Sequence, residues 1–151
     1  MDCDVHERRK HKVDSLKALG DNYKYQTYAG RDATLLEKFR APEVTVQNGL
    51  RVSIMTSEFT CLCPKTGQPD YASIRIHYTP RAWCVESKSL KLYLMSFRNE
   101  GIFHEECVAV IGRALVELLD PASLEVIGEF SARGGIAFQP TFTYTCGCKG
   151  D

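Results

Sequence analysis

The sequence predicts a single α+β domain in which an antiparallel sheet carries two helices on one face. Apolar and polar residues alternate before residue 80 and again after residue 123, a pattern typical of strands with one buried face. Between these stretches the apolar residues recur at helical spacing. The predicted order of elements is therefore strand, strand, helix, helix, strand, strand.

The first 40 residues are predicted to form an N-terminal arm in front of a domain over residues 41–151. The apolar pattern of the arm is weak, and turn-forming residues at 20–22 and 29–32 interrupt it. We expect no more than one short helical turn in this arm.

The first two strands are predicted around a hairpin. Apolar residues alternate up to Asn48-Gly49, a dipeptide that favours a two-residue hairpin turn, and the alternation resumes over residues 50–54. Residues 60–70 contain two prolines and a glycine, so we predict a loop there. Residues 72–78 alternate again and form either a third strand or the continuation of the second one.

The middle of the chain changes to a helical period. Apolar residues at i, i+4 and i+7 over residues 90–97 predict a first helix, and residues 103–118 predict a longer amphipathic one. Asp120-Pro121 ends the second helix. Two further strands are predicted over residues 124–130 and 136–144, joined by a turn at residues 133–135.

Composition limits the function. With 151 residues, 44% of them hydrophobic, the chain is long enough for one domain with a substantial core. The 19 basic residues balance the 19 acidic ones, so no basic field predicts a nucleic-acid or membrane partner. The charged start is unlike a signal peptide, and the seven cysteines lack the spacing of a secreted disulfide framework. We predict a cytoplasmic protein.

Cys63 and Asp70 form the most informative pair of residues. A cysteine thiolate is a strong nucleophile, a carboxylic acid can donate a proton, and the loop between the two residues is short enough to bring both into one pocket. Structural roles are also open from the pattern alone, because a cysteine commonly packs in a core and an aspartate after a proline commonly closes a turn. Cys61 adds a second candidate thiol.

The starts of the two helices carry further polar residues. Ser87 and Lys88 can serve as an N-cap and a solvated face, or together as an anion site at a helix start. His104 and Glu105 open the second helix, where an acidic side chain stabilises the helix dipole by ~0.3–1 kcal/mol. No Gly-x-Gly-x-x-Gly segment is present, so a Rossmann-type cofactor site has no support.

The segments at residues 59–70, 86–93, 103–107, 120–121 and 133–135 resemble the short, single-module nitrile reductases of queuosine biosynthesis. The resemblance covers roughly the last two thirds of the chain. It implies the tunnelling fold, in which the sheets of several subunits join edge to edge into an oligomeric barrel with ligand sites between subunits. It also implies NADPH-dependent reduction of 7-cyano-7-deazaguanine to 7-aminomethyl-7-deazaguanine, through a covalent thioimide and with two NADPH consumed.

The resemblance also implies a role for each matching residue. The catalytic residues would be Cys63 as nucleophile and Asp70 as proton donor, with no metal. Glu105 would accept hydrogen bonds from the ring N–H and amino group of the deazaguanine, and His104 would orient it or assist proton transfer. The remaining expected contacts are Val85, Glu86 and Ser87 with the substrate, and Ser87, Lys88, Arg133 and Gly134 with NADPH.

Two alternatives remain open. One is a non-reducing enzyme of the same fold, either an amidine-forming transferase or a pterin-type cyclohydrolase. The other is a metal-binding module built from the two Cys-x-Cys pairs at residues 61–63 and 146–148, although zinc sites favour a wider spacing. Cys107 is predicted to be a core residue, with pairing to Cys63 under oxidation as the alternative.

Overall fold

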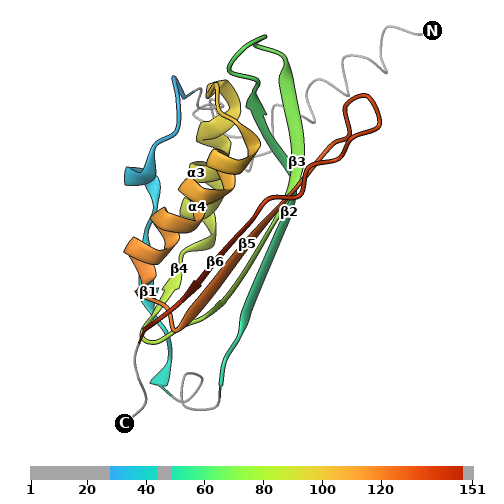
Figure 1. Ribbon diagram of the computed structural model, residues 1–151. Helices are drawn as coiled ribbons and strands as arrows, with labels where there is room; N and C mark the ends of the chain where they lie inside the picture. The colour runs from blue at the N-terminus through green and yellow to red at the C-terminus, as the bar shows by residue number, and fades with distance from the viewer. Residues whose placement is uncertain (1–27, 44–48, 148–151) are drawn as a thin grey trace, which may run out of the picture.

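The computed structural model describes residues 28–43 and 49–147, whose main feature is a four-stranded antiparallel sheet (Figure 1). Every strand of this sheet is hydrogen-bonded to its neighbour in an antiparallel register. The strands lie in the order β2 (Val52–Leu62), β3 (Pro69–Thr79), β5 (Ser123–Phe130) and β6 (Thr141–Thr145).

Two helices cover one face of the sheet, as the sequence predicts. They are α3 (Ser87–Ser96), continued by a short 3-10 turn η3 (Phe97–Asn99), and α4 (His104–Leu119). Helix α4 packs over β5 and β6, and α3 lies toward β2. The predicted order of strand, strand, helix, helix, strand, strand is confirmed.

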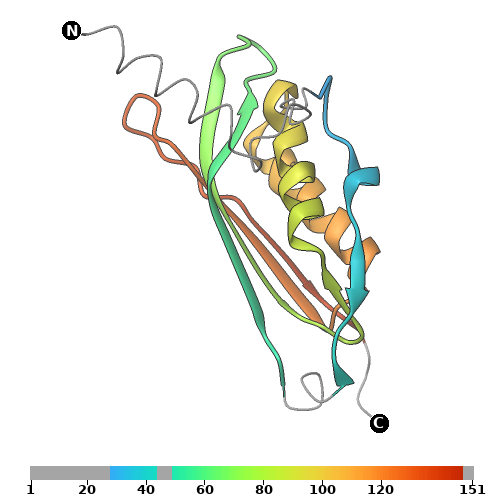
Figure 2. The ribbon, with the colours of Figure 1, turned by 180° about the vertical axis from the view of Figure 1, so that it is seen from behind.

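A second, two-stranded sheet lies on the other side of the helices and was not predicted. Strand β1 (Lys38–Arg40) pairs antiparallel with β4 (Trp83–Val85), and a 3-10 turn, η2 (Ala33–Leu35), precedes it. Figures 1 and 2 show β1 beside the helical layer, away from the large sheet. The part of the arm from residue 28 onward is therefore packed against the domain. The boundary at residue 40 stays a prediction.

Strand β2 contains a bulge that changes which of its side chains face the helices. Thr56 pairs with Ile74 and Phe59 pairs with Ala72, so β2 has one extra residue between these pairs. Even-numbered residues such as Ile54 point inward before the bulge, whereas Phe59 and Cys61 are buried after it. The bulge therefore shifts the inward-facing set by one residue.

The loop predicted over residues 60–70 is wrong at both ends. The β2–β3 ladder continues through the pairs Cys61↔Asp70 and Leu62↔Pro69, so only residues 63–68 connect the strands. Proline is tolerated as the first residue of a strand, where its missing N–H breaks no essential ladder bond. Residues 72–78 belong to the second strand of this hairpin, which settles the alternative that the sequence left open.

The last predicted strand is shorter than expected, because only Thr141–Thr145 forms β6. A tight turn joins Arg133 to Ile136. The Gly128 and Phe130 N–H groups still donate to Pro140 O and Phe138 O, but Pro140 has no N–H to return a bond, and the regular strand begins only at Thr141. The strand predicted over residues 44–47 and the turn residue Asn48 lie outside the described residues.

The N-cap of α3 is Glu86, whereas the sequence suggested Ser87. The Glu86 carboxylate accepts hydrogen bonds from the N–H of Lys88 at 2.9 Å and of Ser89 at 2.7 Å. Helix α4 begins at His104 as predicted and ends at Asp120, whose left-handed φ of 44° closes the last turn.

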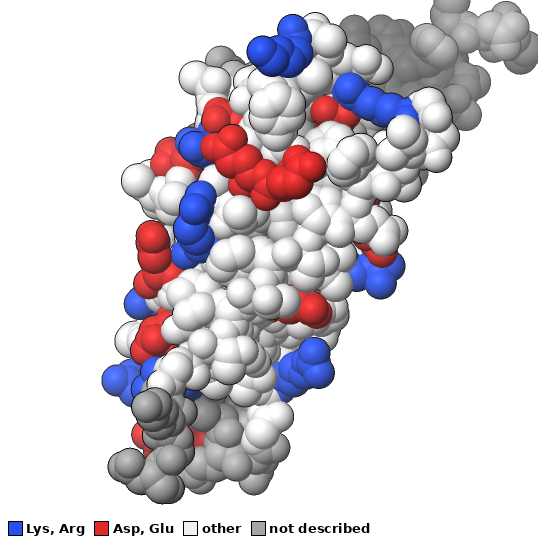
Figure 3. All heavy atoms as spheres, in the orientation of Figure 1, with Lys and Arg blue, Asp and Glu red and all other residues white. Residues whose placement is uncertain are grey.

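Charges of both signs are mixed on the face of the molecule shown in Figure 3. On the face in Figure 3, acidic and basic side chains surround a broad uncharged area, without a continuous basic stripe. No helix within residues 28–43 and 49–147 has the length and apolar character needed to cross a membrane.

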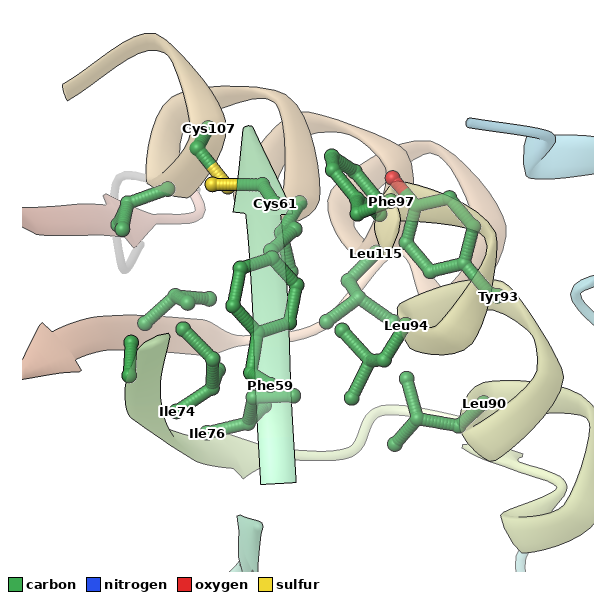
Figure 4. Packing of buried hydrophobic residues seen from close by; sticks show 14 of the residues in the cluster. Phe59, Cys61, Ile74, Ile76, Leu90, Tyr93, Leu94, Phe97, Cys107 and Leu115 are labelled. Atoms are coloured by element: carbon green, nitrogen blue, oxygen red, sulfur yellow. The ribbon is translucent and has the colours of Figure 1, made fainter. Parts of the chain in front are cut away.

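The core lies between the large sheet and the helices (Figure 4). Burial of each large apolar side chain there contributes about 1.5–3 kcal/mol to folding. Cys61 from β2 and Cys107 from α4 are both fully buried, and their sulfur atoms lie side by side. The prediction that Cys107 is a core residue is confirmed, and its neighbour is Cys61. The larger core residues in Figure 4 are Phe59, Ile74, Ile76, Leu90, Tyr93, Leu94, Phe97 and Leu115.

We predict that Gly112→Ala destabilises the domain although alanine is the better helix former. A methyl group at Gly112 on α4 would overlap the Phe142 ring, so this ring, β6 or the helix must shift. Overpacking of this kind costs about 1–3 kcal/mol, which exceeds the gain of ~1 kcal/mol in helix propensity. Urea unfolding should show a lower midpoint.

The neighbouring substitution Arg113→Ala is the control, because Arg113 is exposed on the same helix. It should change stability by less than about 0.5 kcal/mol. A raised urea midpoint for Gly112→Ala would contradict the close packing of α4 on β6.

Candidate active site

A cavity of about 310 Å³ lies where the β2–β3 turn, the start of α4 and the tip of the β5–β6 hairpin meet. Apolar side chains, among them Ile102, Phe103, Ile136 and Phe138, form much of its wall. Five of the sequence-predicted site residues also line it: Cys63, Asp70, His104, Glu105 and Arg133. The expectation that Cys63 and Asp70 share one pocket is confirmed.

The β2–β3 turn positions Cys63 and activates its thiol. The Cys63 N–H donates to Gln68 O at 2.8 Å, and the Gly67 N–H donates to Cys63 O at 2.9 Å. Hydrogen bonds from the Thr66 hydroxyl, and then from the backbone N–H groups of Thr66 and Lys65, lower the pKa of Cys63 from its ordinary 9.0 to about 7. A large fraction of this half-buried thiol is therefore the nucleophilic thiolate at neutral pH.

Cys61 is in a different environment although it lies only two residues away. It is fully buried, and its thiol is hydrogen-bonded to that of Cys107. This bond lowers the pKa of Cys61 and, together with burial, raises the pKa of Cys107. Because a substrate cannot reach a fully buried sulfur, Cys63 is the only one of these three thiols suited to attack a ligand.

Asp70 lies on the buried face of β3 and is 5% exposed. Each of its carboxylate oxygens has its own partner. His104 Nε2 is 3.2 Å from Oδ2, and Arg133 Nη2 forms an ion pair with Oδ1. A buried charge without such partners would be strongly destabilising.

His104 is placed by the segment that joins the helices. Leu62 donates to Glu100 O at 2.8 Å and accepts from Ile102 N at 3.0 Å, so this segment is tied to the end of β2. The His104 ring then stacks on Phe130, with centroids 3.9 Å apart. These contacts hold the imidazole toward Asp70.

Arg133 reaches Asp70 from a tight turn at the tip of the β5–β6 hairpin. Arg133 and Ile136 exchange two backbone hydrogen bonds of 3.0 Å. Gly134 and Gly135 between them have φ values of 57° and 82°, which L side chains rarely adopt. The sequence suggested this arginine as a cofactor ligand, and its partnership with Asp70 was not foreseen.

The other predicted residues lie apart from this cavity. Val85 and Ser87 line a separate groove of about 370 Å³ between β2 and α3, which also contains the exposed Met55. Glu86 and Lys88 are their neighbours in the chain. A single chain therefore does not bring this second group of residues to Cys63.

The start of α3 does not offer the backbone anion site that the sequence suggested. The Glu86 carboxylate already occupies the N–H groups of Lys88 and Ser89, and these bonds lower the pKa of Glu86. Only the exposed side chains of Ser87 and Lys88 remain available to a ligand.

Three residues of the site were missed in the sequence. Phe130 stacks on the His104 ring, Phe138 makes an edge contact with it, and Thr66 donates to Cys63. The aromatic residues were assigned to strands, and nothing in their alternation indicates that they pack on a histidine from α4. Thr66 could have been found from its place beside Cys63 in a turn.

The structure gives no support to a metal site in the residues that it describes. Across residues 28–43 and 49–147, no three His, Cys, Asp or Glu side chains are arranged to hold a metal ion. Cys148, one half of the second Cys-x-Cys pair, lies outside these ranges.

Comparison with known proteins connects this chain to one family. The model of the family described as QueF-like protein matches residues 69–147. A relative from Neisseria meningitidis serogroup B, named NADPH-dependent 7-cyano-7-deazaguanine reductase, is 48% identical over 139 residues, which are 91% of this chain and 85% of the relative. A relative of the same name from Streptococcus thermophilus is 63% identical over 87 residues, 58% of this chain and 53% of the relative.

The fold is also found among solved structures. A crystal structure of the archaeosine synthase QueF-Like in the apo form superimposes with a TM-score of 0.56. The match covers 66% of this chain and 95% of that protein, at 19% sequence identity. At this identity the likeness concerns the fold, which is the tunnelling fold expected from the sequence.

We predict that iodoacetamide modifies Cys63 with a half-maximal rate near pH 7, because the pKa of Cys63 is lowered to about 7. Thr66→Val removes the hydroxyl that contributes most to this shift, so the midpoint should move toward 9.0. The rate at pH 7 should fall by up to about tenfold for each pKa unit. Peptide mass spectrometry measures the modification at each pH.

Thr141→Val, an exposed substitution on β6, is the matched control and should leave the midpoint unchanged. Cys61 and Cys107 should stay unmodified in the folded protein because both are fully buried. A midpoint near pH 9 for the unsubstituted protein would contradict the activation of Cys63 by its turn.

Proposed function

The chain belongs to the QueF-like family, and from this premise we propose that it catalyses the NADPH-dependent reduction of 7-cyano-7-deazaguanine. The product is 7-aminomethyl-7-deazaguanine, an intermediate in the biosynthesis of the tRNA nucleoside queuosine. The observation that carries the proposal is a half-buried thiol, with a pKa of about 7, in the same cavity as the buried Asp70 carboxylate. Relatives that bear this activity in their names support it.

Cys63 begins the reaction in this proposal. Its thiolate adds to the carbon of the nitrile, the carbon–nitrogen triple bond becomes a double bond, and the nitrogen takes up a proton. The product is a thioimide covalently attached to Cys63. Addition of the thiol makes the nitrile carbon a better hydride acceptor than it is in the free substrate.

Asp70 and His104 take part in proton transfer to the substrate nitrogen in this proposal. Asp70 takes up the proton that the Cys63 thiol releases and passes it to the thioimide nitrogen, and His104, 3.2 Å from the Asp70 carboxylate, orients the substrate or assists this transfer. After the first reduction the carbon–sulfur bond breaks, Cys63 leaves as a thiolate and an imine forms. The second reduction converts the imine to the amine.

Glu105 recognises the deazaguanine ring in this proposal. Its carboxylate, exposed at the start of α4, lines the cavity and accepts hydrogen bonds from the ring N–H and the exocyclic amino group. Phe103 and Phe138 line the same cavity and supply apolar surface for a planar base.

The residues present fit an anionic cofactor at the cavity mouth. Within the described parts of the chain, Arg133 is the only lysine or arginine that lines the cavity, and added atoms at Gly134 would meet nothing within 4 Å. Arg133 and Gly134 would hold NADPH together with the side chains of Ser87 and Lys88. Two NADPH molecules, bound there in turn, would each supply one hydride.

The separation of the two groups of residues supports a site shared between subunits. Val85 and Ser87 line the second groove, away from Cys63, and would reach the cavity of a neighbouring subunit together with the adjacent Glu86 and Lys88. Strands β2 and β6 are the two edges of the large sheet, and an exposed edge readily pairs with another chain. We therefore propose a homo-oligomeric barrel in the cytoplasm, without a direct nucleic-acid or membrane partner.

We predict that the purified protein oxidises two NADPH for each 7-cyano-7-deazaguanine converted. Cys63→Ala should abolish the reaction because no covalent intermediate can form, and Cys61→Ala should keep it because that thiol is buried. NADPH absorbance together with chromatography of the amine product measures the ratio.

A Cys63-dependent adduct without NADPH consumption would instead identify a non-reducing enzyme of the same fold. The mass of the protein after incubation with the nitrile alone distinguishes this outcome. If neither the adduct nor NADPH oxidation is observed, both activities are rejected.

We predict that two inactive variants restore activity when they are mixed. Cys63→Ala removes the nucleophile, and Glu86→Ser removes the proposed substrate contact while a serine can still cap α3. If each site combines halves from two subunits, unfolding and refolding a 1:1 mixture should recover roughly a quarter of the wild-type activity.

Refolding each variant alone is the control and should recover no activity. Circular dichroism checks that Glu86→Ser remains folded. A mixture that stays inactive, although both variants fold and assemble together, would place the complete site within one subunit.

A further inference from the structure

The two carboxylate oxygens of Asp70 contact different side chains. Oδ2 faces His104 and Oδ1 faces Arg133, so the carboxylate can orient the guanidinium without giving up its contact with the imidazole. Arg133 Nη2 also lies 3.5 Å from Pro69 O. Both contacts come from the same nitrogen and point to the start of β3, so they fix one end of the guanidinium at Asp70.

The rest of the guanidinium hydrogen-bonds to the Cys63 thiol and is partly accessible from the cavity mouth. The Arg133 side chain is 39% exposed, whereas Asp70 is 5% exposed, so the ion pair runs from the buried sheet face to the cavity mouth. Guanidinium is planar and has five N–H donors, which allows it to hold a carboxylate at one edge and bind a second anion at another.

The charges around the cavity make this orientation important for an anionic ligand. Among the described residues, its charged lining consists of the carboxylates of Asp70 and Glu105 and the guanidinium of Arg133, with His104 beside them. An anionic group entering the cavity is repelled by two side chains and attracted by one. The place of the single guanidinium therefore determines where that group can bind.

We propose that Asp70 is a positioning residue for the cofactor, because its ion pair keeps an edge of the Arg133 guanidinium turned toward an anionic group of NADPH. The inference rests on the proposed function, in which this cavity takes NADPH. It gives Asp70 a second role besides passing the proton to the substrate nitrogen. Asp70 contacts the reacting nitrile group and, through its ion pair with Arg133, also sets the position of the cofactor.

The test measures NADP⁺ affinity by titration calorimetry, with no nitrile present, so that no chemistry takes place. The proteins are the full chain, Asp70→Asn, Arg133→Gln and the double variant. Arg133→Gln should weaken binding by about tenfold or more, because a charged hydrogen-bond donor is lost. Asp70→Asn should weaken it by about threefold or more, and this effect should vanish in the Arg133→Gln background.

Whether Asp70→Asn weakens or tightens NADP⁺ binding distinguishes a positioning role of Asp70 from a purely electrostatic effect of its charge. Removing a nearby negative charge by itself should tighten the binding of an anion, so weaker binding requires that Asp70 acts through Arg133. Arg133→Lys is a second readout. It keeps the charge without the planar fork, and it should recover less than half of the affinity lost in Arg133→Gln on a logarithmic scale.

Arg113→Gln is the matched control, since it removes an exposed arginine of α4 away from the cavity, and it should change NADP⁺ affinity by less than about twofold. Tighter binding by Asp70→Asn in both backgrounds, or unchanged binding by Arg133→Gln, would overturn the inference while leaving the reductase intact. A folded full chain that binds no NADP⁺ would overturn the proposed function and the inference with it.

Discussion

The candidate site depends on a single buried carboxylate. Asp70 is the first residue of the inward-facing stripe of β3, and the next inward positions, Ala72 and Ile74, belong to the apolar core. A charge on that face is tolerated only with close partners of opposite or hydrogen-bonding character. The tip of the β5–β6 hairpin supplies Arg133 and the start of α4 supplies His104, so the requirements of one side chain bring three distant segments together.

The backbone around this carboxylate is arranged to meet those requirements. The bulge in β2 turns Phe59 and Cys61 inward and so sets the direction in which the chain enters the Cys63 turn. The end of β2 is also hydrogen-bonded to the segment before α4, which brings His104 to the same place. A strand without the extra residue would turn Cys61 outward and would change the side on which the turn opens.

Three of the seven cysteines, Cys61, Cys63 and Cys107, illustrate how the surroundings determine the role of a residue type. Cys61 and Cys107 share a hydrogen bond in the core, where no ligand can reach them. Cys63 lies at a turn that directs a hydroxyl and backbone N–H groups at its sulfur, and its pKa falls to about 7 as a result. The same thiol group is therefore a buried core side chain at two positions and suited to be a nucleophile at the third.

The sequence alone determined the order of the elements, both helices and the association of Cys63 with Asp70, because these follow from local periodicity and short spacing. It left the pairing of β2 with β3 open. Family likeness added the fold and the activity. It did not indicate the bulge or the β1–β4 pairing, and it assigned Arg133 to the cofactor without its contact to Asp70. Those features depend on contacts between residues far apart in the chain, such as Asp70 and Arg133, which are separated by 63 residue numbers. Only the tertiary structure decides which distant groups meet, since the alternation of a strand identifies its buried face but not the side chains that cover it.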